Sequence, residues 1–348
     1  MVKNMVRIVI DCFGGDNSPI ANIEGALEAL KLDKDFIAVL AGDEDIIKKH
    51  LANYQFDSSR VEFLDAKEVI TCEEQPTEAV KKKPNSSLVK GCLALGDNAD
   101  AFVSTGSTGA LLVGCTLKVG RIRGVSRPAL LPTLPTLTGG EVVMLDVGAN
   151  ADCKPLNLFH FAIMGSVYAS EVLGIENPRV ALLSNGTEDA KGNELIKQVN
   201  YAFRHCPSIN FVGNIEARDI ISGECDVVVT DGFTGNVAIK SMEGISGAIF
   251  TTLKRSVSRS FVSKIGALLM KKSLKEVKNS LDYNKKGGAV FIGAKKVVVK
   301  AHGSSKASAI TASILQAKRA CQNNIVDLIK EKIENTPVPP FSAEESAS

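Results

Sequence analysis

Two stretches of the sequence place glycine and polar residues where a buried strand should end and a helix should begin. They cover residues 179–193 and 226–236. In an open α/β sheet, ligands bind at the carboxyl ends of strands, and a helix N-terminus offers free N–H groups and a positive dipole to an anion. Lys191 and Asn236 have side chains suited to an anion. We therefore expect them to face one another across a single binding site.

Two earlier loops have similar chemistry. Residues 11–19 contain two adjacent glycines and a proline, and residues 104–109 are all small or hydroxyl-bearing. Glycines let a ligand approach the backbone, and hydroxyl groups can bond to phosphate oxygens. Neither loop has the spacing of a nucleotide fingerprint or a Walker lysine. The alternatives are a tight structural turn for the first loop and helix capping by Ser107 or Thr108 for the second.

Possible metal ligands are few and poorly spaced. Asp146, Asn150 and Asp152 form an oxygen-rich loop, but without the spacing of a calcium loop. The eight cysteines are scattered and include no C-x-x-C pair, which argues against a zinc site. Among the four histidines only His302 lies in a Gly/Ser loop, where a structural role fits as well as a chemical one. We predict neither a metal nor a cofactor.

The composition excludes several classes of protein. A formal net charge of +2 is too close to neutral for general nucleic-acid binding, and the absence of Trp argues against a base-stacking surface. No apolar run approaches the roughly 18 residues of a membrane span. The chain opens without a secretory signal, and its scattered cysteines suit a reducing compartment. We expect a cytoplasmic protein.

Short β-branched strands alternate with helices along most of the chain, which predicts an α/β fold with a doubly wound, mostly parallel sheet. We expect one α/β catalytic domain over residues 1–334, interrupted by a helical excursion at 242–286. The Pro- and Ser-rich segment 335–348 is expected to be disordered.

The excursion has a basic and amphipathic character. Residues 254–278 contain eight lysines and arginines and a single acid. Ile265, Leu268 and Leu269 fall on one helical face. Because basic amphipathic helices can lie in an anionic lipid surface, we predict that these three residues contact a membrane. The alternative is a helical contact between subunits with a solvated basic rim.

Seven motifs, taken in order, closely resemble the bacterial phosphate acyltransferase (PlsX) family over about residues 6–330. Together they are far more specific than any single loop. They are IDCFGGD at 10–16, STGSTGA at 104–110, LDVGANAD at 145–152, LSNGTEDAKG at 183–192, FVGNIEARD at 211–219, TDGFTGNV at 230–237 and KAHGSS at 300–305.

The resemblance implies a homodimer with a three-layer αβα fold, related to the isopropylmalate dehydrogenases and phosphotransacetylases. It implies transfer of a long acyl chain from acyl carrier protein to inorganic phosphate, giving acyl-phosphate for phospholipid synthesis. Residues 242–286 would correspond to the helical tip that holds the family at the inner face of the cell membrane. The downstream glycerol-3-phosphate acyltransferase is a further candidate partner.

By the same resemblance, Lys191 would neutralise the phosphate or the developing oxyanion, and Asn236 would donate a hydrogen bond to the same centre. The chain departs from the family at Cys12-Phe13, Ser107 and Val290, where Ala-Met, Asn and Pro are usual. The residues expected to line the substrate are Gly14, Gly15, Asp16, Ser104, Thr105, Gly106, Ser107, Thr108, Asn150, Asn185, Thr187, Thr234 and His302.

Three alternatives remain open. A dehydrogenase of the isopropylmalate type would share the fold, but the chain lacks a nucleotide loop and clustered metal aspartates. A non-catalytic membrane scaffold would use the 242–286 segment alone and would not need six polar strand ends. Cys12 could act as an acyl-accepting nucleophile, although no histidine partner is evident in the sequence.

Overall fold

The strands form two β-sheets in the computed structural model, which describes residues 5–280 and 286–342. In the larger sheet the first five strands are parallel, and the sixth pairs antiparallel with both of its neighbours. Its order is β3 (Val61–Asp65), β2 (Phe36–Gly42), β1 (Val6–Asp11), β4 (Ala101–Ser104), β12 (Val297–Lys300), β11 (Ala289–Ile292) and β5 (Ala129–Leu131).

The smaller sheet is also mostly parallel. Only its first strand runs antiparallel to its neighbour. Pro132 alone separates the last strand of the larger sheet from the first strand of the smaller one, so one extended segment connects the two sheets. The order is β6 (Thr133–Pro135), β7 (Glu141–Leu145), β10 (Val227–Val229), β8 (Val180–Ser184) and β9 (Phe211–Glu216).

Helices cover both faces of the larger sheet, because its strands send alternate side chains to opposite faces. Ile8 and Ile10 of β1 join one apolar core, whereas Val9 between them joins another. The first core is covered by α1 (Ile20–Leu32), α2 (Glu44–Leu51) and α11 (Ala307–Gln322), and the second by α3 (Pro76–Lys82), α4 (Ser87–Asp97) and α5 (Thr108–Gly114).

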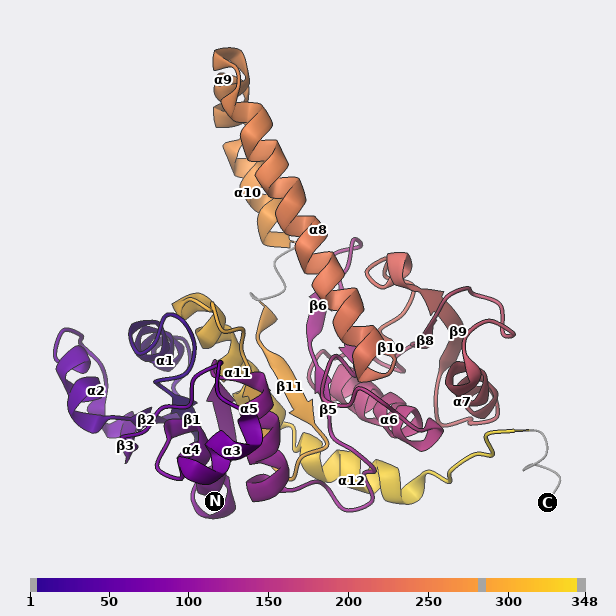
Figure 1. The fold of residues 1–348 in the computed structure, drawn as a ribbon, viewed down its shortest axis with the longest axis horizontal. Helices are drawn as coiled ribbons and strands as arrows, with labels where there is room; N and C mark the ends of the chain where they lie inside the picture. The colour runs from indigo at the N-terminus through magenta and orange to yellow at the C-terminus, as the bar shows by residue number, and fades with distance from the viewer. Residues whose placement is uncertain (1–4, 281–285, 343–348) are drawn as a thin grey trace.

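A long, mostly apolar helix, α6 (Pro155–Glu171), packs against β7 and β10 of the smaller sheet (Figure 1). Its Phe159, Phe161 and Tyr168 are among the largest fully buried side chains, and they belong to the core that both sheets share. The remaining elements of the body are α7 (Glu194–Arg204), α12 (Ile325–Asn335), short 3-10 helices at Ser58–Arg60 and Ala217–Asp219, and a π-helical turn at Cys115–Val119.

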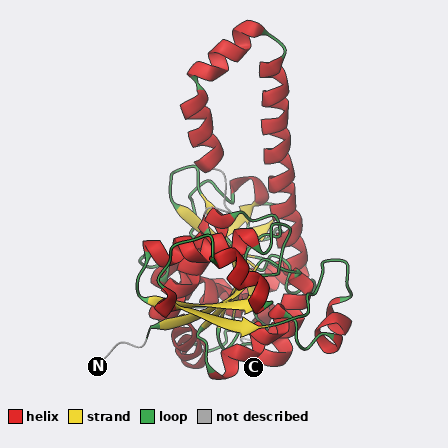
Figure 2. Ribbon diagram, turned by 90° about the vertical axis from the view of Figure 1, so that its left-hand side faces the viewer, coloured by secondary structure: helices red, strands yellow, loops and turns green. Residues whose placement is uncertain are grey.

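Three helices form an arm that projects from the body (Figures 1 and 2). They are α8 (Gly232–Ser258), α9 (Phe261–Leu269) and α10 (Lys271–Ser280). The predicted excursion at 242–286 is therefore helical, although residues 281–285 lie outside the described residues. Within the described part of the chain, no helix is both long and apolar enough to span a bilayer.

The predicted α/β class, with mostly parallel strands and flanking helices, is confirmed. The strands are divided between two sheets because β5 pairs with β11 in the larger sheet, whereas β6, which follows directly after Pro132, pairs with β7 in the smaller sheet. In the segment predicted to be disordered, residues 336–342 contain neither helix nor strand, and Phe341 packs against the shared core. Residues 343–348 lie outside the described residues.

Candidate active site

The carboxylate of Asp11 organises the loops at the carboxyl edge of the larger sheet. Asp11 is 1% exposed and ends β1. One of its oxygens accepts hydrogen bonds from Ser87 Oγ at 2.6 Å and from the Phe13 amide at 3.2 Å. The other oxygen accepts from Ser104 Oγ at 2.7 Å. Burial raises the pKa of this carboxyl above its ordinary value, and the hydrogen bonds oppose that shift.

Three loops that are distant in sequence meet around this carboxylate. Thr105 Oγ1 donates to the carbonyl of Gly14 at 2.6 Å, and the amide of Asp16 donates to the carbonyl of Gly303 at 2.8 Å. A Cβ at Gly14 would lie 2.6 Å from the amide nitrogen of Gly106, so only glycine fits there. Of the predicted site residues, the structure brings together Gly14, Gly15, Asp16, Ser104, Thr105 and Gly106.

A second buried carboxylate, Asp146, organises the smaller sheet in the same way. It is fully buried just after β7, and burial raises its pKa. Its oxygens accept from the amides of Leu130 and Ala149 and from both the amide and the side chain of Asn150. No cluster of three or more acidic, cysteine or histidine side chains suited to a metal occurs in the described residues. Asp146 therefore acts as an internal hydrogen-bond acceptor.

The loop after Asp146 lies against the N-terminus of α8. The amide of Gly232 donates to the carbonyl of Asn150 at 2.9 Å. Asp231 caps the helix by accepting from the Thr234 amide at 2.8 Å. A Cβ at Gly148 would lie 3.7 Å from the side chain of Asn236. The predicted residues Asn150, Thr234 and Asn236 are thus neighbours.

Lys191 is presented on a loop that closes on itself. The side chain of Asn185 accepts from the amide of Gly192 at 2.9 Å, and Asn193 caps α7. Lys191 and Asn236 are both exposed, and neither side chain has a hydrogen-bond or ion-pair partner among the described residues. No such bond joins them to each other, so their facing one another remains a prediction.

An open groove of about 680 Å³ lies between the loop that follows β8 and the first turns of α8, and Lys191 and Asn236 are not part of its lining. Asn185 and Thr234 lie at its polar side. Its other walls are largely aliphatic, and two of them, Val237 and Ile245 of α8, are at least half exposed. The groove therefore combines polar groups from two predicted loops with an uncovered apolar surface.

Other predicted residues take more peripheral places. Ser107 caps α5 by accepting from the Ala110 amide at 3.4 Å, as the capping alternative predicted. Thr108 and Thr187 are exposed on their loops. The exposed ring of His302 bonds through Nδ1 to Ser304 Oγ at 2.8 Å, which fits a structural role.

Lys300 is a residue that the sequence analysis did not select. It ends β12 and is only 8% exposed. Its amine donates to the carbonyl of Thr105 at 3.5 Å and to that of Ala301. Burial lowers its pKa to about 8. The available signal was a charged residue that directly follows three buried valines at a strand end.

Cys12 is fully buried, and its thiol lies 3.6 Å from the carbonyl of Ile10. Burial, and then the charge of Asp11, raise the pKa of this thiol well above its ordinary value. Because the thiolate is the nucleophilic form, these surroundings suppress the reactivity of Cys12.

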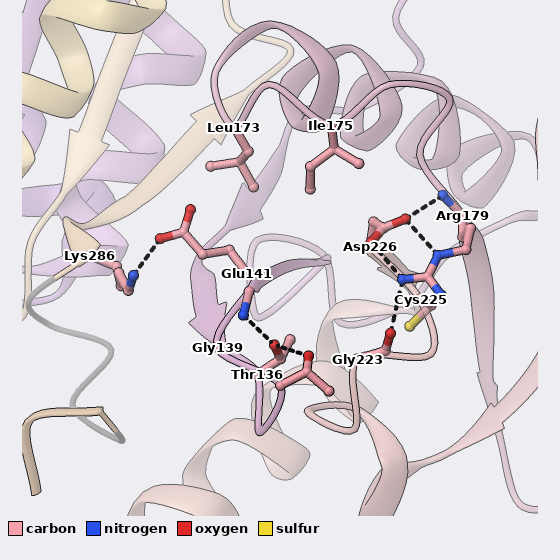
Figure 3. Close-up of a pocket in the computed structure, with 12 residues that line it drawn as sticks. Thr136, Gly139, Glu141, Leu173, Ile175, Arg179, Gly223, Cys225, Asp226 and Lys286 are labelled. Carbon is pink, nitrogen blue, oxygen red and sulfur yellow. Dashed lines mark hydrogen bonds and ion pairs between the residues drawn. The ribbon is translucent and has the colours of Figure 1, made fainter. Parts of the chain in front are cut away.

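A separate cavity of about 390 Å³ lies beside the β6–β7 hairpin (Figure 3). The cationic side chains in its lining, Arg179 and Lys286, each form an ion pair with a carboxylate. Arg179 pairs with Asp226 at 2.9 Å, and Lys286 pairs with Glu141 at 2.7 Å. This cavity is therefore poorly suited to an anionic ligand, unlike the loops described above.

Solved structures confirm the fold. A phosphotransacetylase from Streptococcus pyogenes superposes with a TM-score of 0.61 at 16% identity, over 92% of this chain and 95% of that one. A branched-chain phosphotransacylase from Enterococcus faecalis superposes with a TM-score of 0.57 at 14% identity, over 91% and 99% of the two chains. At these identities the likeness concerns the fold alone.

Sequence relatives are much closer. A phosphate acyltransferase from Bacillus licheniformis is 46% identical over 331 residues, which cover 94% of this chain and 98% of that protein. One from Clostridium perfringens is 44% identical over 329 residues, with coverages of 94% and 97%. The model of a family described as fatty acid synthesis protein matches residues 6–328. The chain therefore belongs to this family and is a phosphate acyltransferase.

Proposed function

We propose that the enzyme transfers a long acyl chain from the thioester of acyl carrier protein to inorganic phosphate. The observation that carries the proposal is a pair of exposed side chains, Lys191 and Asn236, which have no side-chain partner within residues 5–280 and 286–342 and lie beside glycine-rich strand ends. A cation and an amide donor without internal partners suit an anionic substrate and a developing oxyanion.

Phosphate is itself a competent nucleophile, so the protein need not supply one. A phosphate oxygen bonds to the thioester carbonyl carbon, and the negative charge moves to the carbonyl oxygen. Collapse of this tetrahedral species breaks the C–S bond, and the carrier thiolate leaves and takes a proton from water. The products are acyl-phosphate and free carrier thiol, without an acyl-enzyme.

In this reaction the protein positions two reactants and stabilises charge. Lys191 neutralises the phosphate or the oxyanion, and Asn236 donates its side-chain N–H to the same centre. The loops at 14–16 and 104–108 supply backbone and hydroxyl donors. The buried carboxylate of Asp11 holds the Ser104 end of the second loop in place, and that of Asp146 holds the separate loop at 147–150.

The apolar groove at the start of α8 supports an acyl substrate. Its volume of about 680 Å³ lies within the usual range for ligand pockets, roughly 300–1,000 Å³. It begins beside Asn185 and Thr234 and continues along Val237 and Ile245. An acyl chain in this groove would keep its thioester end near the polar loops.

The arm supports association with a membrane surface. Leu268 and Leu269 of α9 are 68% and 82% exposed, and Ile265 is 47% exposed. The basic residues around them would add attraction to anionic lipids. We propose a cytoplasmic enzyme that binds peripherally to the inner face of the membrane, where its product is used.

Further partners belong to the same proposal. Acyl carrier protein would dock on basic side chains near the site. Two copies of the chain would form a homodimer, and the exposed apolar side chains of α8, including Ile249 at 59% exposure, support such a contact. The downstream glycerol-3-phosphate acyltransferase would receive the product.

The test is an incubation of the purified protein with long-chain acyl-acyl carrier protein and inorganic phosphate. We expect free carrier thiol and hydroxylamine-reactive acyl-phosphate to appear in equal amounts, both dependent on phosphate. Thiol release without acyl-phosphate would indicate a thioesterase. Release of neither, from a folded protein, would reject the proposal, and a test of NAD binding would then examine the dehydrogenase alternative.

A further inference from the structure

Lys300 lies directly beneath a loop of the proposed site. It is the last residue of β12 and pairs in register with Ser104, the last residue of the parallel strand β4. The chain continues from Ser104 into the loop at 105–107, and the amine of Lys300 donates to the carbonyl of Thr105 at 3.5 Å. The ammonium group therefore lies at the carboxyl edge of the larger sheet, where ligands of α/β proteins bind.

No carboxylate neutralises this amine in the described part of the chain. Lys300 is 8% exposed and its hydrogen-bond acceptors are two backbone carbonyls. A second buried lysine, Lys318, is 4% exposed and forms an ion pair with Asp33. Burying a charge without a direct ion pair is costly, and a group retained in that state is a candidate for binding an anion.

The charged groups that act on Lys300 come from both sides of the site. Burial is the largest influence on its pKa. Cys72, Asp11 and Asp16 oppose this effect, and Lys240 of α8 reinforces it. Asp11 is nearby, but its oxygens already accept from Ser87, Ser104 and the Phe13 amide. Lys240 lies on α8, which follows β10 of the smaller sheet.

We propose that Lys300 is a buried cation that binds an oxygen of the phosphate substrate at the 104–107 loop. This inference rests on the proposed function and assigns the larger sheet its own charged ligand. Lys191, on the smaller sheet, would then act on the opposite side of the reacting centre. Lys300 would bind the phosphate from the side of the larger sheet. The acyl thioester would enter from the groove along α8.

Steady-state kinetics with inorganic phosphate as the varied substrate test the proposal. We expect Lys300→Met to raise KM for phosphate about 10- to 100-fold, the loss expected for one charge-assisted hydrogen bond, with little change in KM for the acyl carrier thioester. The matched control is Lys295→Met, because Lys295 is exposed at the opposite end of β12. It should keep the wild-type constants. An unchanged phosphate KM in folded Lys300→Met, or a rise confined to the carrier KM, would overturn the proposal.

The pH dependence of kcat/KM for phosphate shows whether Lys300 binds the phosphate or only supports the 104–107 loop. With a pKa of about 8, Lys300 loses its charge as the pH rises through that value. The wild-type kcat/KM for phosphate should therefore fall on the alkaline side. The arginine of the Lys300→Arg variant stays charged, so this variant should not show the alkaline decrease. Ionisation of phosphate itself affects both proteins equally. The same alkaline decrease in both would contradict the proposal.

Calorimetric titration of the wild-type protein with inorganic phosphate needs no variant and no turnover. We expect binding at pH 7 that weakens by up to about tenfold at pH 9, since roughly nine-tenths of a group with pKa 8 is neutral there. Equal affinity at both pH values would overturn the role of Lys300. If the wild type makes no acyl-phosphate, the proposed function fails, and this titration still decides whether Lys300 binds the anion.

Discussion

The hydroxyl of Ser104 donates a hydrogen bond of 2.7 Å to the buried carboxylate of Asp11. The hydroxyl oxygen of Ser104 also accepts a hydrogen bond from the amide of Gly106 at 3.0 Å. One side chain thus fixes the turn of its own loop and connects it to the end of the neighbouring strand β1. The geometry of the phosphate-binding loop in our proposal depends on this connection.

We expect Ser104→Ala to lower the free energy of unfolding by about 1–3 kcal/mol, because a buried carboxylate oxygen loses its donor. It should also raise KM for phosphate, since the Gly106 turn loses its acceptor. Denaturant unfolding and steady-state kinetics measure the two effects. Ser87→Ala is the control, because Ser87 donates to the other oxygen of Asp11 from α4. It should cost similar stability without a comparable change in KM, and equal changes in KM would contradict the assignment.

Cys12→Ala should keep turnover within a few-fold of the wild type. The thiol is fully buried, and its raised pKa keeps it protonated at neutral pH. A small loss of stability is expected from the missing sulfur atom. The acyl-phosphate assay and a thermal melt check both points. Loss of activity in a folded Cys12→Ala protein would instead favour the acyl-enzyme mechanism.

Leu268→Glu should weaken binding to vesicles that contain anionic lipid, because it places a charge on the exposed face of α9. Vesicle co-sedimentation at low and at physiological salt measures the effect. Leu32→Glu is the control, since Leu32 is 64% exposed at the end of α1, in the body. Leu268→Glu that binds vesicles normally but no longer dimerises would show that α9 is a subunit contact.

The ion pair between Arg179 and Asp226 should make stability depend on acid pH (Figure 3). Burial favours a higher pKa for Asp226, but the hydrogen bonds and charge of Arg179 outweigh it and lower the pKa. A depressed folded-state pKa gives stability that is present above the unfolded value of about 4 and is lost as the pH falls through the folded value.

Asp226→Asn should therefore lower the free energy of unfolding near pH 7 by about 1 kcal/mol, a modest value because Arg179 is 43% exposed. The difference from the wild type should shrink below pH 4. Guanidinium unfolding from pH 3 to pH 7 measures it. Asp35→Asn, which changes an exposed carboxylate, serves as the control. A difference that stays constant at acid pH would show that ionisation of Asp226 does not contribute.

Much of the fold follows from local pattern. Buried β-branched runs such as Val6–Asp11 predict strands, and the polar loop after each predicts a carboxyl-edge site. The local sequence pattern does not predict the division into two sheets, because this division depends on the pairing of β5 with β11 and of β6 with β7. Three-residue strands carry too little periodicity to reveal such partners.

Residue type and position at a strand end predicted that loops such as those of Gly14 and Ser104 would meet, and the structure brings these two loops together. Lys300 was missed because it stands out only through its burial without an ion pair to a described carboxylate, and such pairing is set by tertiary packing. The sequence placed Asp146 in an oxygen-rich loop but did not reveal its role, for a related reason. Its acceptor role requires the amide of Leu130, which arrives from the other sheet.

The most direct test of this account is phosphate-dependent formation of acyl-phosphate by the wild type beside Lys191→Ala and Asn236→Ala. The exposed Lys197→Ala on α7 serves as the control. We predict a loss of about 10²–10³ in kcat for each site variant, the usual effect of removing one donor to a developing oxyanion, with unchanged thermal stability. Near-normal turnover in both folded site variants would contradict the assignment of the active site.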